Sequence, residues 1–571
     1  MRRSLLATLS TLALTAAGCA DETLSPRYEP PPAFVTNERI VYTDGLHNEN
    51  TEMIALDDRI VLIFRGGETG QIGSDAAHIN VYGSKDGGRT FEKQSEVSGG
   101  KLEGMRDIRD PKLVEMNGKL YLYAISRLPG GHYRDIGGHA WTVRAESSDK
   151  GVTWTDPVKT FSDLDAMGNE TFWGFWRFTK RTSTDANGDA KQTLYALGYD
   201  DGDTQVGMFA SDDGIHWEKR SVVVSSYDDV PSEAELQFFG DHQETAVAIV
   251  RMDNQGILQD GQSAICTSHE PFTAWECSRR VEQRFDGPTW LSLTLGGARR
   301  NFMVARKHLP CTYKRTAIYE LIGDLADPAS QIQVCEIEEL PSAGDTAYTA
   351  VVPLGGTKFL TSWYSSTIPK RGDIAWLDGT FTPADIWLAD VDLAEAPTAC
   401  HAPPAKRVCG TAPLPGGQSG EEAGGDYLMS LAPVIYPSET LLFRTHLTFH
   451  DDSVDVKMQP LDKVTGADVG DAWEATGATI DAAGRFTATF ALQYLPLEAF
   501  PLLEDPFLSL NDVELSGVVA SDELFCGVVT GFAQVYGTSP SDRIDLAGTT
   551  FGAPRIHAGK TPEPVLACPA R

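Results

Sequence analysis

The chain has 571 residues, more than a usual single domain, and this length predicts either two domains or one repeat array with an appendage. Its formal net charge of −32 would repel phosphate backbones and anionic lipid headgroups. We therefore do not expect nucleic acid as a partner.

The N-terminal segment predicts export. Two arginines precede an apolar run at residues 5–17, which is short for a spanning helix and typical of a secretory signal. The residues before Cys19 resemble the lipobox of bacterial lipoproteins, although Ala16 stands where leucine is usual. The alternative is a plain signal peptide cleaved near Ala17. The resemblance implies an exported protein lipid-anchored at the bacterial envelope through Cys19, with a signal peptide at residues 1–19 and a flexible tether at residues 20–37.

The cysteines predict disulfides. Nine are present, and eight remain if Cys19 is lipidated, an even number that suits an exported chain. No CxxC pair occurs, so we expect no zinc site and no other metal or cofactor. Proximity along the chain favours the pairs Cys266–Cys277, Cys311–Cys335, Cys400–Cys409 and Cys526–Cys568.

From about Arg39 the chain consists of short β-type runs separated by turn residues, without a sustained helical period. Six units align on anchors that recur every 55 to 63 residues or so, about the length of a four-stranded blade with its loops. We therefore predict an all-β protein with a six-bladed β-propeller over residues 38–398. The anchors are Glu52, Asp110, Trp173, Glu235, Trp290 and Tyr348.

A polar turn motif recurs between blade strands. It reads SKDGGRTF at residues 84–91, SSDKGVTW at 147–154 and SDDGIHW at 211–217, with a degraded copy, TSHEPFTAW, at 267–275. The motif resembles the Asp box of sialidases and related propellers, where it lies on the rim away from the active centre. We therefore interpret Asp86, Asp149 and Asp213 as turn residues and the final aromatic as a plug between blades.

A second polar stretch, TDANGDA at residues 184–190, has the oxygen-rich spacing of a small calcium loop around Asp185. A plain hairpin turn is the favoured interpretation of this stretch.

After the propeller the composition changes. Residues 399–426 are rich in Pro and Gly and predict a linker. Residues 427–571 alternate like the strands of a β-sandwich or small barrel, and we find no catalytic motif there. A structural appendage is the favoured interpretation, and a carbohydrate-binding module is the alternative.

The mouth of the propeller channel is predicted to be unusually polar, because the start of each inner strand and the end of each second strand converge there. These positions supply five arginines and several carboxylates. The set is His47, Asn48, Glu52, Arg65, Glu68, Arg109, Asp110, Trp173, Arg177, Glu233, Glu235, Arg251, Trp290, Arg306, Asp345, Tyr348 and Tyr364.

The order Glu, Arg, Arg, Tyr across blades four to six resembles the sialidase superfamily. The resemblance implies Tyr348 as nucleophile, either Glu235 or Glu233 as its base, and Arg251 with Arg306 as a clamp on the sugar carboxylate. A neutral phenol avoids the repulsion that a carboxylate nucleophile would meet beside an acidic sugar. Asp75 stands where the family places its acid/base residue, with His78 as a neighbouring candidate.

Blade one departs from that pattern. The family carries its first clamp arginine in the first inner strand, where this chain has Asn48-Glu49-Asn50-Thr51. Arg109 is a possible substitute from another blade. The sequence IRDP around Asp110 resembles a strand of five-bladed furanosidases in which the aspartate stabilises the transition state. The motifs HNENTEM at residues 47–53, FRGGE at 64–68 followed by His78, DIRDPKL at 107–113, SEAEL at 232–236 and GDTAY at 344–348 resemble a group of secreted bacterial sialidase-like propellers, and this resemblance covers residues 41–393.

Each site residue also has a structural interpretation. Arg65 with Glu68, or Arg109 with Asp110, can form ion pairs at the channel entrance, and Trp173 and Trp290 can be plugs between blades instead of sugar platforms. Three functions follow: an exo-glycosidase acting on sialic acid or a related acidic sugar, a glycosidase for another sugar that uses Asp110 and Glu233, or a non-catalytic glycan-binding propeller. Each implies glycans as partners, and we expect a monomer.

Overall fold

We describe the protein from a computed structural model. Several predictions fall on residues outside its described part: the signal peptide with Cys19, Asp75, Asp185, Cys311, and the pair Cys400 and Cys409. The described residues are 34–68, 70, 76–99, 102, 107–127, 141–164, 170–184, 188, 190–200, 204–253, 261–309, 313–366, 374–396, 414–418, 423–434, 436–437, 439–500, 507–535, 544–558 and 560–569.

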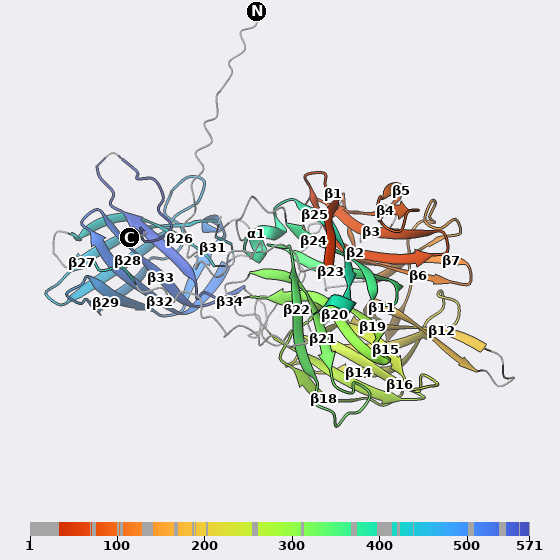
Figure 1. Cartoon of the computed structure of the whole chain (residues 1–571). Helices are drawn as coiled ribbons and strands as arrows, with labels where there is room; N and C mark the ends of the chain where they lie inside the picture. Colours follow the sequence, from red (N-terminus) through yellow and green to blue (C-terminus); the bar gives the residue numbers. More distant parts are fainter. Residues whose placement is uncertain are drawn as a thin grey trace, which may run out of the picture. The chain divides into compact units, whose positions relative to one another are not determined.

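The chain forms two compact units, one mainly of residues 26–407 and the other mainly of residues 408–571. The first unit is a six-bladed β-propeller and the second is a β-domain, so the predicted all-β class is confirmed (Figure 1). No helix within the described ranges is long and apolar enough to cross a membrane.

Each blade is an antiparallel sheet. Short turns with left-handed residues join the first and second strands, as at Asn117-Gly118, Gly296-Gly297 and Gly355-Gly356, which is the signature of tight hairpins. Blade one contains β2 (His47–Leu56), β3 (Arg59–Gly67), β4 (His78–Ser84) and β5 (Glu92–Ser98), and blade two contains β6 (Asp107–Met116), β7 (Lys119–Arg127), β8 (Trp141–Ser147) and β9 (Val158–Lys159). Blade three contains β10 (Ser162–Leu164), β11 (Glu170–Thr184), β12 (Ala190–Asp200), β13 (Gln205–Ser211) and β14 (Glu218–Ser225), and blade four contains β15 (Pro231–Phe239), β16 (Thr245–Met252), β17 (Gln262–His269) and β18 (Glu276–Val281). Blade five contains β19 (Asp286–Leu295), β20 (Ala298–His308), β21 (Lys314–Ile322) and β22 (Gln333–Leu340), and blade six contains β23 (Thr346–Gly355), β24 (Lys358–Ser366) and β25 (Ala384–Asp392).

The N-terminal strand closes the ring. β1 (Val35–Tyr42) pairs antiparallel with β25 and so forms the outer strand of blade six (Figure 1). Because β1 begins at Val35, residues 35–37 belong to the propeller and not to the expected tether. Blades one and six also meet through the parallel pair of His47 and Ala384.

All six inner strands carry a register shift near their start. In each inner strand, two consecutive residues lie opposite a single residue of the second strand. This arrangement is a β-bulge, which changes the direction in which the side chains point. This common feature corrects the anchors used to align the units, because they do not share one place: Asp110 and Tyr348 begin their bulges, whereas Glu235 and Trp290 lie three residues after the start of theirs. The bulged pairs are Asn50-Thr51, Asp110-Pro111, Trp176-Arg177, Ser232-Glu233, Gly287-Pro288 and Tyr348-Thr349.

The repeated polar motif is a hydrogen-bonded turn between the third and fourth strands of a blade. In the first copy the Ser84 hydroxyl donates to Asp86, and Asp86 accepts from the Thr90 amide and hydroxyl. The copies at Ser147 and Ser211 make the corresponding contacts. The three aspartates therefore accept hydrogen bonds from residues of their own turns.

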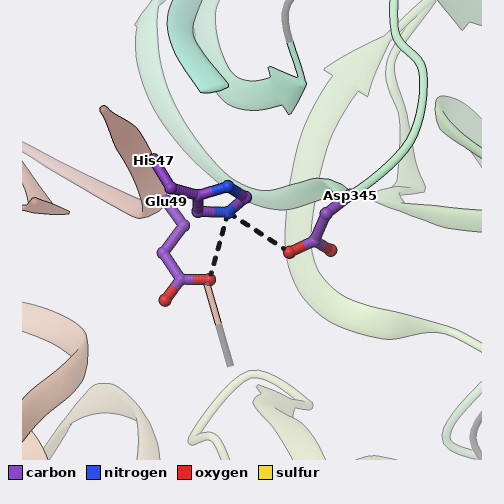
Figure 2. A group of neighbouring side chains, drawn as sticks. All are labelled: His47, Glu49 and Asp345. Carbon is purple, nitrogen blue, oxygen red and sulfur yellow. Dashed lines mark ion pairs between the residues drawn. The ribbon is translucent and has the colours of Figure 1, made fainter. Parts of the chain in front are cut away.

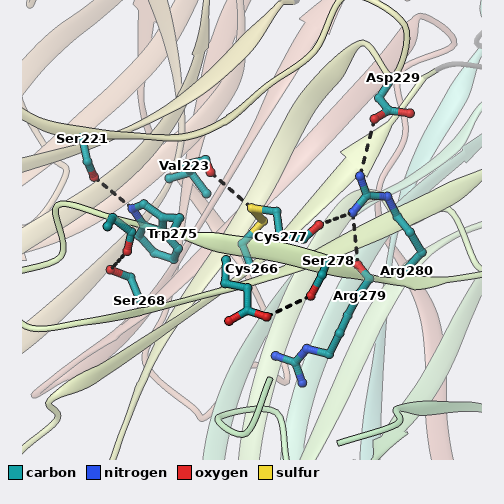
Figure 3. The surroundings of a disulfide bond; sticks show 12 residues. Ser221, Val223, Asp229, Cys266, Ser268, Trp275, Cys277, Ser278, Arg279 and Arg280 are labelled. Atoms are coloured by element: carbon teal, nitrogen blue, oxygen red, sulfur yellow. Dashed lines mark hydrogen bonds and ion pairs between the residues drawn. A yellow bond between two sulfur atoms is a disulfide. The ribbon is translucent and has the colours of Figure 1, made fainter. Parts of the chain in front are cut away.

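In blade four the corresponding turn has no aspartate, and a disulfide joins the two strands that flank it. Cys266 on β17 is bonded to Cys277 on β18, as predicted (Figure 3). The indole of Trp275 donates to the Ser221 hydroxyl on β14, 2.9 Å away, and so ties blade four to blade three. Cys335 is also disulfide-bonded, and Cys311, its expected partner, lies outside the described residues.

The second unit is built from one sheet whose terminal strands, β29 and β30, contact each other, so it forms a nearly closed barrel. The alternation of buried and exposed residues in β27 and β30 explains the period seen in the sequence. The predicted Cys526–Cys568 disulfide is present. The strands are β26 (Gly425–Ala432), β27 (Leu441–Phe449), β28 (Ser453–Pro460), β29 (Trp473–Thr479), β30 (Arg485–Phe490), β31 (Gln493–Pro496), β32 (Phe507–Ser521), β33 (Leu524–Val535), β34 (Ile544–Asp545) and β35 (Thr549–Pro554), and the short helices of the chain are α1 (Trp376–Thr380), η2 (Leu393–Glu395) and η4 (Leu497–Ala499).

Candidate active site

Tyr348 and Glu233 form the centre of the candidate site. Tyr348 begins the bulge of β23 with a φ of +45°, a conformation that non-glycine residues rarely adopt and that is concentrated at functional sites. Its hydroxyl donates to Glu233 Oε1 over 2.6 Å, and Glu233 belongs to the bulge of β15. Tyr348 is partly exposed while Glu233 is buried, so Tyr348 is the member of the pair that a ligand can reach.

The surroundings keep the phenol protonated. Burial raises the pKa of Tyr348 well above its ordinary value, and the negative charge of Glu233 acts in the same direction. Burial also raises the pKa of Glu233, although Arg251 opposes this effect. The pair is therefore a phenol with a carboxylate placed to accept its proton.

Arg251, near the end of β16, joins this pair to further carboxylates. Its Nη1 is 2.7 Å from Glu233 Oε1 and 3.4 Å from the Tyr348 hydroxyl. Its Nε is 2.7 Å from Asp253 Oδ1 and 3.3 Å from Asp286 Oδ1. Three carboxylates of the protein thus surround one guanidinium group.

Arg306, near the end of β20, lies over the ring of Tyr348. Its guanidinium carbon is 5.0 Å from the centre of the Tyr348 ring. Its Nη2 is 2.8 Å from Asp345 Oδ1 and donates to the Tyr364 hydroxyl over 3.0 Å. The structure therefore brings together Tyr348, Arg306, Asp345 and Tyr364, all of which the sequence analysis proposed.

Asp286 is a site residue that the sequence analysis missed. It is fully buried, and its carboxylate contacts Arg251, Arg284 and His308 at 3.3, 2.7 and 2.9 Å. Burial alone would raise its pKa, but Arg251 and Arg284 outweigh burial and hold the pKa well below the ordinary value. A signal was present in the sequence, because Asp107, Asp286 and Asp345 all stand at or next to the first residue of an inner strand.

Glu235 belongs to a separate ionic group. Arg177 Nε is 2.8 Å from Glu235 Oε1, and Arg177 also pairs with Glu52. Burial raises the pKa of Glu235 to about 8. The sequence left Glu233 and Glu235 as alternative bases for Tyr348. Among the described contacts, only Glu233 accepts a hydrogen bond from the Tyr348 hydroxyl.

Blade three contributes a different tryptophan from the one expected. Trp173 is fully buried in a cluster with Phe175 and Phe209, so it is a core residue and not a sugar platform. Trp176, in the bulge of β11, instead meets Tyr348 edge to face, with ring centres 5.6 Å apart. The ammonium of Lys112 lies 4.3 Å from the Trp176 ring, and burial lowers the pKa of Lys112 to about 8.

Two of the proposed sugar-binding arginines are paired inside the wall. Arg65 is fully buried, with Nη1 2.7 Å from Glu49 Oε1 and Nε 3.0 Å from Asp107 Oδ1. Arg109 Nη2 is 2.8 Å from the other oxygen of Asp107. Both arginines form ion pairs of the kind that the structural interpretation expects, but their partners are Glu49 and Asp107 instead of Glu68 and Asp110.

The remaining proposed residues lie in different places. Asp110 has a φ of +50° and accepts a hydrogen bond from Asn50 over 2.6 Å. Its negative charge adds to the effect of burial in raising the pKa of Tyr348. His78 contacts Asn80 and Glu96, and no described contact joins it to Tyr348. Within the described part, His47, Glu49 and Asp345 form the group of side chains that could hold a metal ion.

Comparison with solved structures gives distant neighbours. An α-L-arabinanase from Penicillium chrysogenum is 14% identical with a TM-score of 0.43, over 63% of this chain and 99% of that one. A NanB structure with optactamide is 12% identical with a TM-score of 0.48, over 64% and 72%. The Trypanosoma rangeli sialidase with sialic acid is 11% identical with a TM-score of 0.41, over 92% and 90%. No protein-family model and no curated protein matches the chain.

Proposed function

We propose that the protein is a retaining glycoside hydrolase in which Tyr348 is the nucleophile and Glu233 its base. The observation that carries this proposal is the 2.6 Å hydrogen bond from the hydroxyl of Tyr348, a partly exposed residue, to the buried Glu233 carboxylate. A nucleophile hydrogen-bonded to a base that a third group holds in turn is the arrangement of covalent catalysis, and Arg251 is that third group.

The proton follows this hydrogen bond. Glu233 accepts the phenolic proton as the Tyr348 oxygen forms a bond to the anomeric carbon, and the bond to the leaving oxygen breaks. An acid supplies a proton to the leaving group and then removes one from the water that releases the sugar from Tyr348. We propose Asp75 as this acid from its place in the sequence, with Asp110 as the alternative because it begins the bulge of β6 as Tyr348 begins that of β23.

Charge compensation favours a sugar without a carboxylate. An acidic sugar needs arginine forks that are free to bind it. The four arginines proposed for this role each contact carboxylates of the protein, and the added negative charge would repel an acidic ligand. The pairs are Arg65 with Glu49 and Asp107, Arg109 with Asp107, Arg251 with Glu233 and Asp253, and Arg306 with Asp345.

A sialoside is the second candidate substrate. The specific observation in its favour is the tyrosine itself, because a neutral nucleophile suits an anomeric centre that carries a carboxylate. The two candidates differ in the charge of the substrate and share Tyr348 and Glu233.

Hydrolysis of 4-methylumbelliferyl glycosides tests both statements. A panel of neutral glycosides, with the sialoside alongside, should show turnover of a neutral member, and Tyr348→Phe should abolish it. Tyr42→Phe is the matched control, since the Tyr42 hydroxyl donates to Asp44 outside the site. Unchanged turnover in Tyr348→Phe would refute the mechanism, whereas turnover of the sialoside alone would refute only the neutral sugar.

A further inference from the structure

Three buried side chains meet where blade one adjoins blade six. His47 and Glu49 are at the start of strand β2, and Asp345 directly precedes β23. His47 Nε2 is 3.4 Å from Asp345 Oδ2 and 3.8 Å from Glu49 Oε2 (Figure 2). Each side chain is at most 3% exposed, so these atoms depend on one another, and not on solvent, for their polar contacts.

The hydrogen bond of His47 Nδ1 determines whether Nε2, the nitrogen that faces the carboxylates, carries a hydrogen. His47 Nδ1 is 2.7 Å from the carbonyl oxygen of Thr382. A carbonyl oxygen only accepts, so Nδ1 carries the hydrogen and Nε2 of the neutral ring presents a lone pair. Neither Nε2 nor Asp345 Oδ2 has a hydrogen-bond partner among the described residues. Buried acceptors that face one another are unfavourable unless a cation lies between them.

The opposite oxygens of both carboxylates are already held. Asp345 Oδ1 accepts from Arg306 over 2.8 Å and from Tyr364 over 2.9 Å. Glu49 Oε1 accepts from Arg65 over 2.7 Å. These contacts, like the one between His47 and a backbone carbonyl, are the outer-shell supports that orient metal ligands in proteins.

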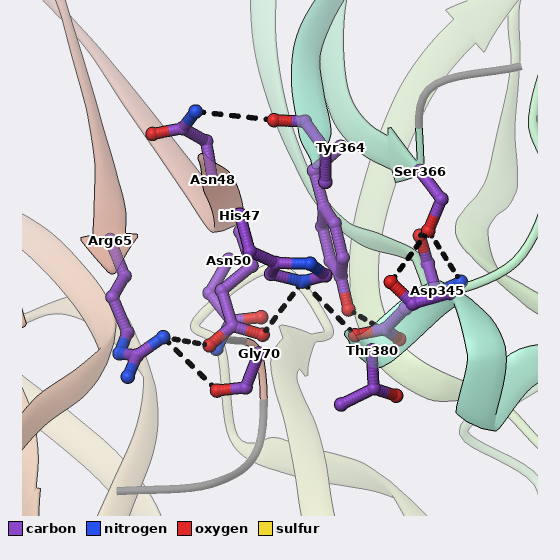
Figure 4. A network of polar contacts seen from close by, with 12 residues as sticks. His47, Asn48, Asn50, Arg65, Gly70, Asp345, Tyr364, Ser366 and Thr380 are labelled. Atoms are coloured by element: carbon purple, nitrogen blue, oxygen red, sulfur yellow. Dashed lines mark hydrogen bonds and ion pairs between the residues drawn. The ribbon is translucent and has the colours of Figure 1, made fainter. Parts of the chain in front are cut away.

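A glycine leaves room beside these atoms. A Cβ atom at Gly70 would lie 2.8 Å from His47 Nε2 and 3.2 Å from Asp345 Oδ2, so any other residue would fill the space next to both (Figure 4). The Gly70 backbone is fixed there, since its amide donates to Thr380 and its carbonyl accepts from Arg65. The space is thus adjacent to the two unpartnered atoms and is kept open by the backbone.

We propose that His47 Nε2, Glu49 Oε2 and Asp345 Oδ2 bind a divalent transition-metal ion, for which Zn²⁺ is the best match. A tetrahedral zinc ion with bonds of roughly 2.1 Å separates its ligand atoms by about 3.4 Å. The two separations from His47 Nε2, 3.4 and 3.8 Å, are close to that value, and all three ligand atoms lie within 4.8 Å of one another. One imidazole and two carboxylates suit zinc better than calcium, which prefers six or more oxygen ligands.

The ion would join the first blade to the last. It would hold the start of β2 against the residue before β23, at the seam where His47 also pairs with Ala384. Asp345 contacts Arg306, which lies over the Tyr348 ring, so the ion would also fix that side of the candidate active site. The proposal depends on the ligand geometry and not on the proposed hydrolysis.

Metal content and thermal stability test the proposal directly. Purified, tag-free protein is dialysed against a chelator and then titrated separately with Zn²⁺, Mn²⁺ and Ca²⁺ by calorimetry. We expect one equivalent of Zn²⁺ per chain with a Kd below about 1 µM, weaker binding of Ca²⁺, and a rise in the melting temperature of the propeller on binding. X-ray absorption of the zinc complex should show one nitrogen and two protein oxygen ligands.

Two variants remove the site in different ways. His47→Ala deletes a ligand, and Gly70→Ala keeps all three ligands but fills the space, so both should lose stoichiometric zinc. His308→Ala is the matched control, because His308 is equally buried and contacts a carboxylate, Asp286, but is not part of the three-residue group. It should retain one equivalent.

Wild-type protein that binds none of the three ions would overturn the proposal, and a proton on His47 would then be the cation between the carboxylates. Equal loss of zinc in His308→Ala and His47→Ala would overturn it as well. Because the wild-type titration needs no variant, the proposal is testable even if His47→Ala fails to fold.

Discussion

A Cβ atom at Gly287 would lie 2.7 Å from the Cα atom of Tyr348, so only glycine lets the bulges of β19 and β23 approach this closely. Gly287 has a φ of +54°, and its amide donates to the second oxygen of Glu233 over 2.5 Å. One glycine therefore positions both members of the candidate catalytic pair.

Gly287→Ala should lower kcat/KM by about 10²-fold or more without removing any functional group, because a small displacement of reacting atoms costs about that much. The expected cause is displacement of Tyr348 from Glu233. Kinetics on the best substrate of the glycoside panel measure the effect.

Gly296→Ala is the control for backbone strain. Gly296 has a similar φ of +60° in the same blade, but nothing lies within 4 Å of an added Cβ atom. Equal losses of activity in the two variants would show that strain, and not contact with Tyr348, causes the effect.

Glu233→Gln and Glu235→Gln should behave differently although the residues are two apart. Glutamine at 233 cannot accept the Tyr348 proton, and loss of a general base costs roughly 10² to 10⁴-fold in kcat. Glutamine at 235 resembles the protonated acid that a pKa of about 8 implies, so activity at neutral pH should stay within about tenfold. The two kcat values, measured at one pH, check this.

The reverse order of the two effects would move the base to Glu235 and would contradict the geometry of the Tyr348 hydrogen bond. Circular dichroism of both variants establishes that each is folded before the rates are compared.

The fold was predictable because the repeat is long and regular, whereas the pairing of its polar residues was not. Spacing along the chain located the blades and the inward-facing ends of their strands. The sequence left Glu233 and Glu235 as alternatives, since residues two apart share a face of a regular strand, and the bulge of β15 breaks this simple alternation. Trp173, named from its spacing, lies in the core, whereas Trp176 in the bulge of β11 meets Tyr348.

Partners from other blades were equally hidden. Arg65 pairs with Asp107, which lies 42 residues away in the next blade, and a sequence read one blade at a time does not connect them. Aspartate at the start of three inner strands was the available signal, and it becomes informative only once the blades are superposed.

Glu235 should make the propeller less stable as the pH rises from about 5 to 8. The folded state holds a proton up to a pKa of about 8, while the unfolded chain releases it near the ordinary value of 4.5. The stabilisation from protonated Glu235 is complete at pH values below the unfolded-state pKa. It is lost as the pH rises to the folded-state pKa, by up to about 1.4 kcal/mol per pH unit. Urea unfolding of the wild type and Glu235→Gln at several pH values measures the difference in slope.

Glu115→Gln is the control for this experiment. A hydrogen bond from Lys180 lowers the pKa of Glu115. Glu115 therefore changes the stability of the protein only at pH values below the ordinary pKa of a glutamate, and its replacement should leave the pH dependence between 5 and 8 unchanged. Parallel curves for the wild type and Glu235→Gln would mean that Glu235 is ionised throughout this range.

The two described disulfides should stabilise different units by different amounts. Cys526 and Cys568 are 42 residues apart in the barrel, and Cys266 and Cys277 are 11 apart in blade four. Loop-closure entropy grows with the length of the closed loop, so replacing both cysteines by alanine should cost about 4 kcal/mol in the barrel and about 3 kcal/mol in the propeller. Urea unfolding of each unit gives these values, and each double variant is the control for the other unit. A loss in the propeller that exceeds the loss in the barrel would mean that the Cys266–Cys277 bond does not act by loop closure alone but also supports a turn that lacks the aspartate of the repeated motif.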